Sequence, residues 1–458
     1  MIRLFNIYVP TRLLILVITE PLIICGSFLL AVVFCLGHDS LVVLNYQYGL
    51  YKVLAVTALT VLGFDLFDLY DLDQGSLQED IHFRLFVALG LLCCFLAGVG
   101  YAFPQLLLGQ NSLTVGVVIL TFALSGWRFL YSWLLRQRYF RERVYVLGSG
   151  AWADQIVDIL RTRPELGMEV VGWLGAIGGD LRSNDAAGSS LLSAVHKTQA
   201  TRVIVAIRER RGTMPTQELL ELSLSGVKVE DASTIYQKVS GKIDVDSLNP
   251  SLLIFGKGLK LNPAFTFARR VISVVASLTL LVLFLPVIPF VAIAIKLTSP
   301  GPALYRQIRS GLRGKTFTLL KFRTMSCDAE DSTGPAWAQE DDPRITPLGH
   351  WLRKTRLDEI PQLWNVFCGD MDFVGPRPER PEFEEELTRE IPYYGIRHAI
   401  RPGITGWAQI CYEYGASIEK SKEKLKYDIY YIKNMGLGLD LFIILRTLKV
   451  VLLGRGAR

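Results

Sequence analysis

The sequence has few cysteines and no pattern that pairs them. Of its 458 residues only seven are cysteines, none of them in a Cys-x-x-Cys pair, and four lie in apolar runs, where a free thiol behaves as a small hydrophobe. This argues against a zinc site and a disulfide framework. Charge is also sparse: charged residues make up 20% and hydrophobic residues 50%, against about 25% and 45 to 50% in soluble proteins. Disordered and collagen-like classes are excluded.

A large excess of charge of one sign is missing as well. Lys and Arg total 49 and Asp and Glu total 43, giving a net charge of +6, which is too small and too dispersed for a dedicated nucleic-acid binder. The chain also lacks a Gly-x-x-x-x-Gly-Lys loop for ATP phosphates. An anionic surface or a phosphorylated substrate is compatible with this balance. At about 150 residues per domain, the length predicts about three domains.

Long apolar stretches occupy the first third of the chain. They cover about residues 13–36, 48–69, 83–103 and 113–135. Each is close to the ~20 residues that a helix needs to cross a bilayer, and the first is too long and too weakly basic at its start for a signal peptide alone. We predict a four-helix transmembrane bundle over residues 1–140. Glu20 and Arg128 fall within these spans, where charged groups snorkel or pair; a transport role is the alternative.

Basic residues indicate the orientation of this bundle. Arg3 and Arg12 precede the first stretch, and four arginines between residues 136 and 143 follow the fourth. The loops at residues 38–47 and 104–112 contain no Lys or Arg. The positive-inside rule therefore places both ends of the bundle in the cytoplasm.

A fifth apolar segment, residues 271–297, differs from the other four. Pro286 and Pro289 lie near its middle, where each removes a backbone donor and crowds the preceding turn, so a break at Pro286 is expected. Both flanks are basic, which one simple crossing cannot satisfy. We predict a re-entrant helix that breaks within the membrane and returns to the same side. A kinked fifth span, which would send the rest of the chain outside, is the alternative.

A soluble section separates the four spans from the fifth segment. Residues 144–147 are typical of a buried strand, and Gly148-Ser-Gly150 with a helical stretch follows, as at the start of a dinucleotide-binding fold. However, Ala153 replaces the third glycine, no acid closes the second strand, and no Tyr-x-x-x-Lys follows. We predict a Rossmann-like α/β domain over residues 141–261 without catalysis. A membrane-tethered, NAD-dependent nucleotide-sugar dehydratase is the alternative.

Polar motifs are concentrated after the fifth segment. Lys321 and Arg323 end a basic stretch that would meet lipid phosphates or a bound nucleotide at the membrane surface. Farther along, Asp358 and Glu359 are adjacent carboxylates, and Arg353 lies close upstream. One carboxylate can attack phosphorus while Mg²⁺, bound through carboxylates and substrate phosphates, neutralises a diphosphate.

Other polar positions accompany the acidic pair. Arg377 stands between two prolines, whose fixed φ angles stiffen the loop and hold the guanidinium ready for a phosphate, and Arg380 follows it. Asp428 and Asp440 come near the carboxy terminus. The last apolar run, residues 441–453, is too short to cross a bilayer and fits an interfacial helix.

The order of these motifs resembles the bacterial polyprenyl-phosphate sugar-1-phosphate transferases. The resemblance runs from about residue 262 to the end, in Lys321-Phe-Arg-Thr-Met325, Leu357-Asp-Glu-Ile-Pro-Gln-Leu-Trp-Asn365, Val374-Gly-Pro-Arg-Pro378, Arg401-Pro-Gly-Ile-Thr-Gly-Trp-Ala-Gln409 and Tyr427-Asp-Ile-Tyr-Tyr431. The spans and the degenerate nucleotide fold resemble the large, exopolysaccharide branch of this family. Residues 411–417 and 454–458 are similar to members associated with a protein-sorting system.

The resemblance implies a fold and a reaction. The chain would be a multi-domain α and α/β protein whose last domain, residues 262–458, is a mostly helical monotopic catalytic domain. Asp358 would attack a UDP-sugar, most plausibly UDP-glucose or UDP-galactose, and release UMP; undecaprenyl phosphate would then displace the sugar-phosphoryl aspartate. Glu359 would assist at Mg²⁺ or in proton transfer, and both acids would be metal ligands. This is the first membrane step of exopolysaccharide or O-antigen assembly.

The same resemblance suggests binding residues, partners and location. The predicted substrate-binding residues are Lys321, Arg323, Arg353, Arg377, Arg380, Asp428 and Asp440. The partners would be the UDP-sugar, undecaprenyl phosphate and the bacterial membrane, without nucleic acid, and a homodimer is compatible with the sequence. The protein would be multi-pass in the inner membrane, with its catalytic domain on the cytoplasmic face. A sensor or assembly scaffold without catalysis is the third hypothesis.

Overall fold

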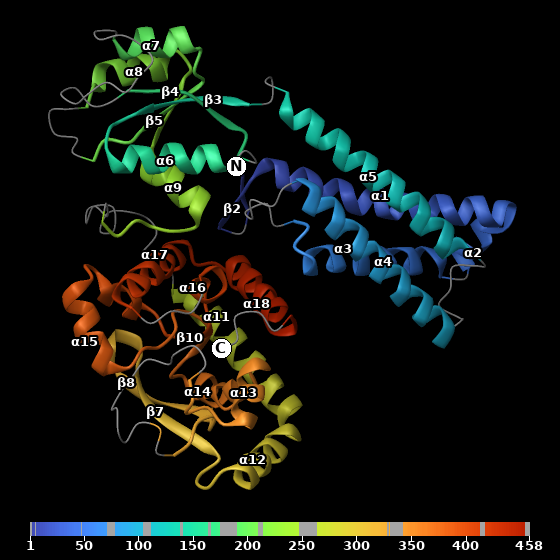
Figure 1. The fold of residues 1–458 in the computed structure, drawn as a ribbon, viewed down its shortest axis with the longest axis vertical. Helices are drawn as coiled ribbons and strands as arrows, with labels where there is room; N and C mark the ends of the chain where they lie inside the picture. Colours follow the sequence, from blue (N-terminus) through green and yellow to red (C-terminus); the bar gives the residue numbers. More distant parts are fainter. Residues whose placement is uncertain are drawn as a thin grey trace. The chain divides into compact units, whose positions relative to one another are not determined.

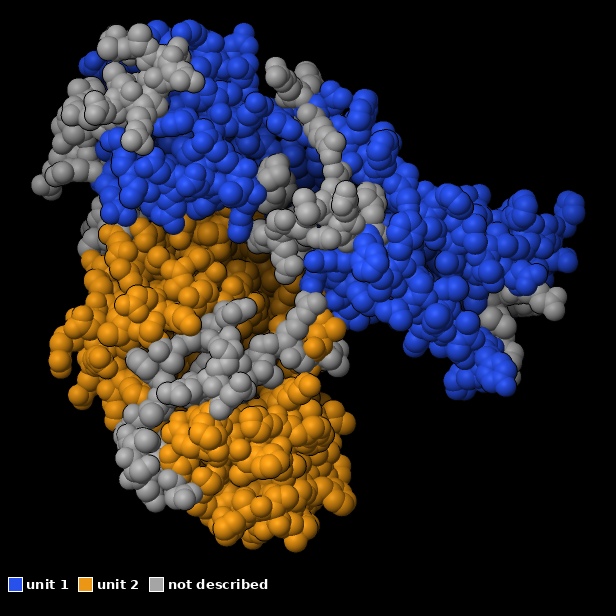
Figure 2. All heavy atoms as spheres, viewed as in Figure 1, with its two compact units in different colours: residues 1–2, 9–235 blue, residues 3–8, 236–458 orange. Residues whose placement is uncertain are grey.

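The computed structural model is mostly helical (Figure 1). It describes residues 2–4, 6–46, 48–70, 78–103, 111–137, 141–163, 166–174, 190–208, 214–246, 263–327, 329, 342–412 and 417–453. These form two compact units, one of residues 1–2 and 9–235 and the other of residues 3–8 and 236–458 (Figure 2). The predicted domain limits at residues 140 and 261 lie outside the described residues. So do residues 413–416 and 454–458, which belong to the segments that resemble members associated with a protein-sorting system.

The apolar helices of the first unit lie where the spans are predicted. They are α1 (Thr11–Leu36), α3 (Gly49–Leu66), α4 (Gln78–Ala102) and α5 (Ser112–Arg136), with the short helices η1 (Gly37–Asp39) and α2 (Ser40–Tyr46) after α1. Each of the four long helices contains a stretch long and apolar enough to cross a membrane. α1 packs along α3 and α5, and α4 also contacts both α3 and α5. The chain is therefore a membrane protein.

A buried ion pair joins α1 to α5. Arg128 donates from Nε to Oε1 of Glu20 at 2.8 Å and from Nη2 to Oε2 at 3.2 Å. The Glu20 side chain is 0% exposed and the Arg128 side chain 8%. Two parallel hydrogen bonds satisfy both charges inside the helix bundle. The two charges that the sequence places within the spans thus pair with each other.

Breaking this ion pair on one side should destabilise the helix bundle. Glu20→Gln leaves the Arg128 guanidinium buried without a counter-charge, and such a loss costs about 3 to 5 kcal/mol. We expect a lower midpoint of thermal unfolding for Glu20→Gln in lipid nanodiscs. The double variant Glu20→Met with Arg128→Met removes both charges and should recover most of the loss. An unchanged midpoint for Glu20→Gln would contradict this account.

A parallel sheet forms the α/β part of the first unit. In the described residues its strands are β3 (Glu142–Leu147), β4 (Met168–Leu174), β5 (Arg202–Val205) and β6 (Lys228–Asp231), in the order β4-β3-β5-β6. α6 (Ala151–Thr162) covers one face, and α7 (Leu191–Thr198) and α8 (Thr216–Leu224) cover the other (Figure 1). Because side chains alternate along a strand, Tyr145 and Leu147 of β3 pack with the residues of α7 and α8. The predicted parallel sheet is confirmed.

The described residues of the second unit are mostly helical, and part of the paired strands β1 (Ile2–Leu4) and β2 (Ile7–Val9) belongs to it. The helices and turns are α11 (Pro263–Phe284), α12 (Val287–Thr298), α13 (Pro347–Lys354), η7 (Leu357–Glu359), α14 (Gln362–Cys368), α15 (Pro381–Glu390), η8 (Tyr394–Ala399), α16 (Trp407–Cys411), α17 (Ile418–Asn434) and α18 (Leu437–Leu452). The strands β7 (Leu304–Ser310) and β8 (Thr316–Phe322) pair antiparallel, and β9 (Asp372–Val374) pairs parallel with β10 (Gly403–Thr405).

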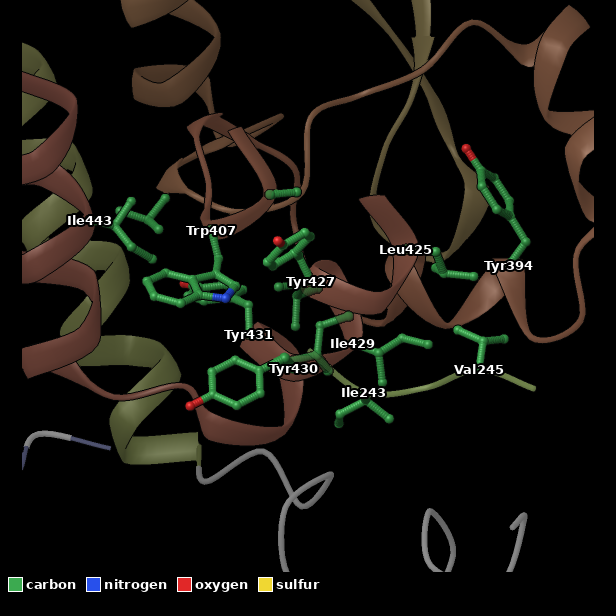
Figure 3. Close-up of a cluster of buried hydrophobic side chains, with 14 of the residues drawn as sticks. Ile243, Val245, Tyr394, Trp407, Leu425, Tyr427, Ile429, Tyr430, Tyr431 and Ile443 are labelled. Atoms are coloured by element: carbon green, nitrogen blue, oxygen red, sulfur yellow. The ribbon is translucent and has the colours of Figure 1, made fainter. Parts of the chain in front are cut away.

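The core of this unit gathers around α17. Figure 3 shows Trp407 beside Tyr430 and Tyr431 among the buried side chains, and the rings of Trp407 and Tyr430 stack with centroids 5.8 Å apart. The indole Nε1 donates to the Gly241 carbonyl at 2.8 Å. The residue that follows α9 (Ala232–Ser240) is thereby bonded to Trp407, which has a structural role in this core.

The fifth apolar segment is a broken helix. Leu285 and Pro286 separate α11 from α12. Pro286 immediately precedes the first turn of α12, where its φ of −67° is helical and no helix hydrogen bond needs its missing N–H. Side chains from both helices join an apolar cluster with Ile360 and Leu363. The residues just after the acidic pair are therefore anchored on the broken helix.

Candidate active site

The acidic pair follows a strained backbone position. Arg356 adopts a left-handed conformation with φ of +57° and ψ of +15°, which is uncommon for a residue other than glycine and costs of order 1 to 3 kcal/mol. It stops α13 and starts the turn η7, which carries Asp358 and Glu359. Strain of this kind persists where the surrounding structure enforces it, typically at functional sites.

Asp358 is directed into the protein. The residue is 6% exposed, and its Oδ1 atom has no hydrogen-bond partner among the described residues. Burial raises the pKa of its carboxyl group and Glu359 adds to the rise, whereas Lys321 and Arg353 oppose it. A buried carboxylate oxygen that accepts no hydrogen bond from the protein keeps its lone pairs for an electrophile.

Glu359, in contrast, is held by cations. Its Oε1 atom accepts hydrogen bonds from Lys321 Nζ and from Arg377 Nη2, both at 3.1 Å, and Arg356 Nη1 lies 3.9 Å away. Burial alone would raise the pKa of Glu359, but Lys321 and Arg377 hold it well below its usual range. The environments of the two adjacent acids push their pKa values apart, which is typical of acids with different roles.

Strand β8 and helix α14 bring Lys321 to the acidic pair. On α14, the Asn365 side chain accepts from the Leu320 N–H at 3.0 Å and donates to the Thr318 carbonyl at 2.8 Å. Asn365 is 3% exposed, so both hydrogen bonds are shielded from water. They fix β8 against the helix that follows the acidic pair. Burial lowers the pKa of Lys321, although Glu359 opposes this shift.

The loop of residues 375–379 presents Arg377 to Glu359. A small hollow lies beside this loop, with Arg377, Arg397 and His398 among its lining residues. Arg380, at the start of α15, lies over the ring of Phe383 with its guanidinium carbon 5.6 Å from the ring centroid. Of the two predicted arginines near this loop, Arg377 is thus the one bonded to the acidic pair.

Arg323 and Arg353 contact neighbouring segments. Arg323 Nη2 donates to the Ser299 carbonyl at 2.8 Å, which fixes the end of α12. Arg353 Nε donates to Thr324 Oγ1 at 3.0 Å. Because Arg353 also lowers the pKa of Asp358, its charge acts on the acidic pair. Arg323 holds the end of α12, and its contact with substrate stays a prediction.

Both downstream acids are buried in ion pairs. Asp440 accepts from Arg269 Nε at 3.1 Å and from the Tyr431 hydroxyl at 2.6 Å. Asp428 is 2% exposed, with Oδ2 lying 3.1 Å from Arg397 Nη2. Burial raises the pKa of Asp428 to about 6, although Arg397 opposes the rise. Asp440 and Asp428, both predicted to bind substrate, thus each pair with an arginine of the protein.

Sequence reasoning missed two of these arginines as site residues. Arg269 appears in the sequence only as a flanking charge of the fifth apolar segment, and Arg397 stands outside the motifs. A buried charge needs a partner, so an arginine beside an apolar helix is a signal that could have found Arg269. For Arg397 we know of no local signal. The Asp358 Oδ1 atom has no partner in the described residues, and the positively charged side chains of Lys321 and Arg377 bind the adjacent glutamate. This arrangement indicates a group-transfer enzyme that acts on an anionic substrate.

Comparison with known proteins identifies the family. The bacterial sugar transferase model matches residues 264–454. The UDP-glucose:undecaprenyl-phosphate glucose-1-phosphate transferase of Escherichia coli (strain K12) is 31% identical over 322 residues, which cover 69% of this chain and 68% of that protein. The protein of the same name from Caulobacter vibrioides is 44% identical over 191 residues, covering 41% and 71%.

A third relative has a different sugar in its name. The UDP-N-acetylgalactosamine-undecaprenyl-phosphate N-acetylgalactosaminephosphotransferase of Aeromonas hydrophila is 38% identical over 240 residues, covering 52% of this chain and 56% of that protein. The present chain belongs to the bacterial sugar transferase family. It is therefore an enzyme, and the resemblance drawn from the motifs is confirmed. The family match covers the acidic pair, which favours transfer chemistry over the dehydratase and scaffold hypotheses.

Proposed function

We propose that this enzyme transfers a hexose 1-phosphate from a UDP-hexose to undecaprenyl phosphate and releases UMP. The observation that carries the proposal is the unpartnered Oδ1 atom of buried Asp358, next to a glutamate that holds Lys321 and Arg377. Glucose and galactose remain the predicted sugars. The product would be the first lipid-linked intermediate of exopolysaccharide or O-antigen assembly.

Two displacements at one phosphorus atom account for the reaction. Asp358 attacks the phosphorus that bears the sugar; an aspartyl O–P bond forms, and the bond to the bridging oxygen breaks as UMP leaves with the electron pair. A phosphate oxygen of undecaprenyl phosphate then attacks the same phosphorus and displaces the aspartate. The attacking and leaving groups are all anions, so neither step needs a general base. Lys321 and Arg377 balance the charge on the transferred group.

In this mechanism Glu359 anchors cations. Because Lys321 and Arg377 hold its pKa low, it stays ionised and is a poor proton acceptor. It places the ammonium and guanidinium groups beside Asp358, where they bind phosphate oxygens. Transfer of protons by Glu359, one of the roles implied by the family resemblance, fits this environment less well.

We propose Mg²⁺ as the cofactor. Asp358 Oδ1 is an unpartnered carboxylate oxygen in the described residues, whereas Glu359 Oε1 already faces two cations. In the same part of the chain no group of three or more His, Cys, Asp or Glu side chains is placed to hold a metal. Mg²⁺ is commonly held by one or two carboxylates together with substrate phosphates. An ion that arrives with the diphosphate would therefore be held by the second carboxylate oxygen of Asp358 and of Glu359, which leaves Asp358 Oδ1 for the attack on phosphorus. Bound there, it would neutralise charge on the diphosphate.

The location is part of the proposal. We place the protein in the inner membrane, with the broken helix α11–α12 re-entrant and the catalytic unit on the cytoplasmic face. The packing of both helices against Ile360 and Leu363 supports this, because it keeps the acidic pair close to a membrane segment. A water-soluble nucleotide and a lipid phosphate can meet only at such a boundary. The α/β section would be a Rossmann-like domain without catalysis, and a homodimer stays a prediction.

Purified full-length enzyme tests this function directly. It would be incubated with undecaprenyl phosphate, Mg²⁺ and UDP-glucose, UDP-galactose or UDP-N-acetylgalactosamine, and UMP would be measured. We expect many UMP molecules per enzyme only when both a UDP-hexose and undecaprenyl phosphate are present, and no UMP when EDTA replaces Mg²⁺. A change in nicotinamide absorbance with NAD and no UMP would favour the dehydratase instead.

A further inference from the structure

We infer that Arg397 is a positioning residue that sets the place of the Arg377 side chain, and that Asp428 acts by holding Arg397. The inference rests on the proposed function, in which Arg377 binds phosphate. Its basis is one guanidinium group that joins a buried acid to the backbone of Arg377. Arg397 Nη2 lies 3.1 Å from Asp428 Oδ2 and donates to the Arg377 carbonyl at 2.8 Å.

The loop that carries Arg377 is held at successive carbonyl groups. Those of Pro376, Pro378 and Glu379 accept from the Gly403 N–H at 3.0 Å, Arg309 Nη1 at 3.1 Å and the Ser310 N–H at 3.0 Å, respectively. The Arg377 carbonyl completes the run, and its donor is Arg397. Two flanking prolines also fix φ on either side. The remaining freedom of this loop therefore depends on the Arg397 contact.

Arg397 is itself rigidly supported. It is 7% exposed, its guanidinium carbon lies 5.1 Å from the centroid of the Tyr394 ring, and it donates to the Tyr394 hydroxyl. Figure 3 shows Tyr394 at the edge of the buried cluster, with its hydroxyl directed away from the other labelled side chains. Burial disfavours the charged guanidinium, but Tyr394 and Asp428 outweigh this and raise the pKa of Arg397. A buried arginine that is paired in this way holds one geometry.

One further contact connects this support to the reacting groups. Arg377 Nη2 donates to Glu359 Oε1 at 3.1 Å, and Glu359 directly follows Asp358. A group displaced by about 1 Å in an active site can lower the rate by about 10²-fold. Loss of the Arg397 contact should therefore reduce turnover through the position of the Arg377 side chain.

A double-mutant cycle separates positioning from a general structural role. Arg397→Lys keeps the positive charge but loses the planar guanidinium group that contacts both Asp428 and the Arg377 carbonyl. We expect it to lower kcat/KM by about 10- to 100-fold. In the Arg377→Ala background the same change should alter kcat/KM by less than about 2-fold, because the group it positions is gone. If Arg397→Lys lowered kcat/KM by the same factor in the Arg377→Ala background as in the unaltered enzyme, the inference would be overturned.

A second variant and a second readout keep the test sharp. Asp428→Asn retains the shape of the side chain without its charge and should show the same dependence on Arg377. The dissociation constant for UDP-glucose, measured by calorimetry in the same cycle, tests the positioning even where turnover is lost. Arg389→Lys, exposed on α15, is the matched control. Failure of the unaltered enzyme to release UMP would contradict the proposed function, whereas multiplying effects on binding would contradict the inference alone.

Discussion

Replacement of Asp358 by asparagine should abolish UMP release. The amide keeps the size of the carboxylate but cannot supply the anionic oxygen that attacks phosphorus, and loss of a nucleophile lowers kcat by up to about 10⁶-fold in well-studied enzymes. We expect a loss of at least about 10³-fold here, measured as UMP released from the UDP-hexose. Asp158→Asn, exposed on α6, is the matched control and should retain activity.

The same reaction should leave a covalent mark on the unaltered enzyme. Without undecaprenyl phosphate, the first displacement stops at the aspartyl sugar phosphate, so about one UMP per enzyme should be released in a burst. Mass spectrometry of the intact chain should show an added hexose phosphate, located on Asp358 by peptide mapping. Undecaprenyl phosphate should remove it. Retained turnover in Asp358→Asn, or an adduct at another residue, would refute the nucleophile.

The membrane helices were predictable because a bilayer constrains them strongly. Any crossing helix must be about 20 residues long and apolar, so the stretch at 113–135 predicts α5 (Ser112–Arg136) almost to the residue. The parallel sheet was predictable for a similar reason, since β3 is a short apolar run followed by glycines and a helix, and β5 is a further buried apolar run. That Glu20 and Arg128 pair with each other was not predictable, because this contact depends on how α1 and α5 pack.

The catalytic motifs predicted residue types but not their contacts. Asp358, Glu359 and Arg377 lie together as their motifs suggest, yet the ion pair of Lys321 with Glu359 joins positions 38 residues apart. The pair of Arg269 with Asp440 spans 171 residues. No local pattern encodes contacts of this kind, because they arise only when α11, α18 and the strands assemble.

Asp428 and Asp440 show the limit of inference from motifs. Both acids belong to polar motifs near the end of the chain, and a polar motif suggests contact with substrate. In the structure each faces a buried arginine, Arg397 in one case and Arg269 in the other, and contact with substrate stays a prediction. A motif position can therefore be required for the shape of a site as well as for its chemistry, and only burial and partners distinguish the two.

Replacement of Glu359 by glutamine should lower activity and move the acid limb of the pH profile to lower pH. The like charge of Glu359 raises the pKa of Asp358, and Glu359 also neutralises Lys321 and Arg377. With glutamine at this position the repulsion disappears and Lys321, no longer neutralised, attracts Asp358 more strongly, so the pKa of Asp358 falls. Asp358 then ionises at lower pH, and the acid limb of kcat/KM follows it.

Activity at neutral pH should nevertheless fall, because Glu359→Gln no longer holds the cations in place. Loss of one oriented electrostatic contact to a transition state costs about 10²- to 10³-fold in kcat, and we expect an effect of this size. The measurement is kcat/KM for UMP release as a function of pH, with Glu386→Gln, exposed on α15, as the matched control. If Glu359 instead removed a proton, the variant would lose the acid limb altogether, and if the acid limb moved to higher pH, the repulsion between the two acids would not govern Asp358.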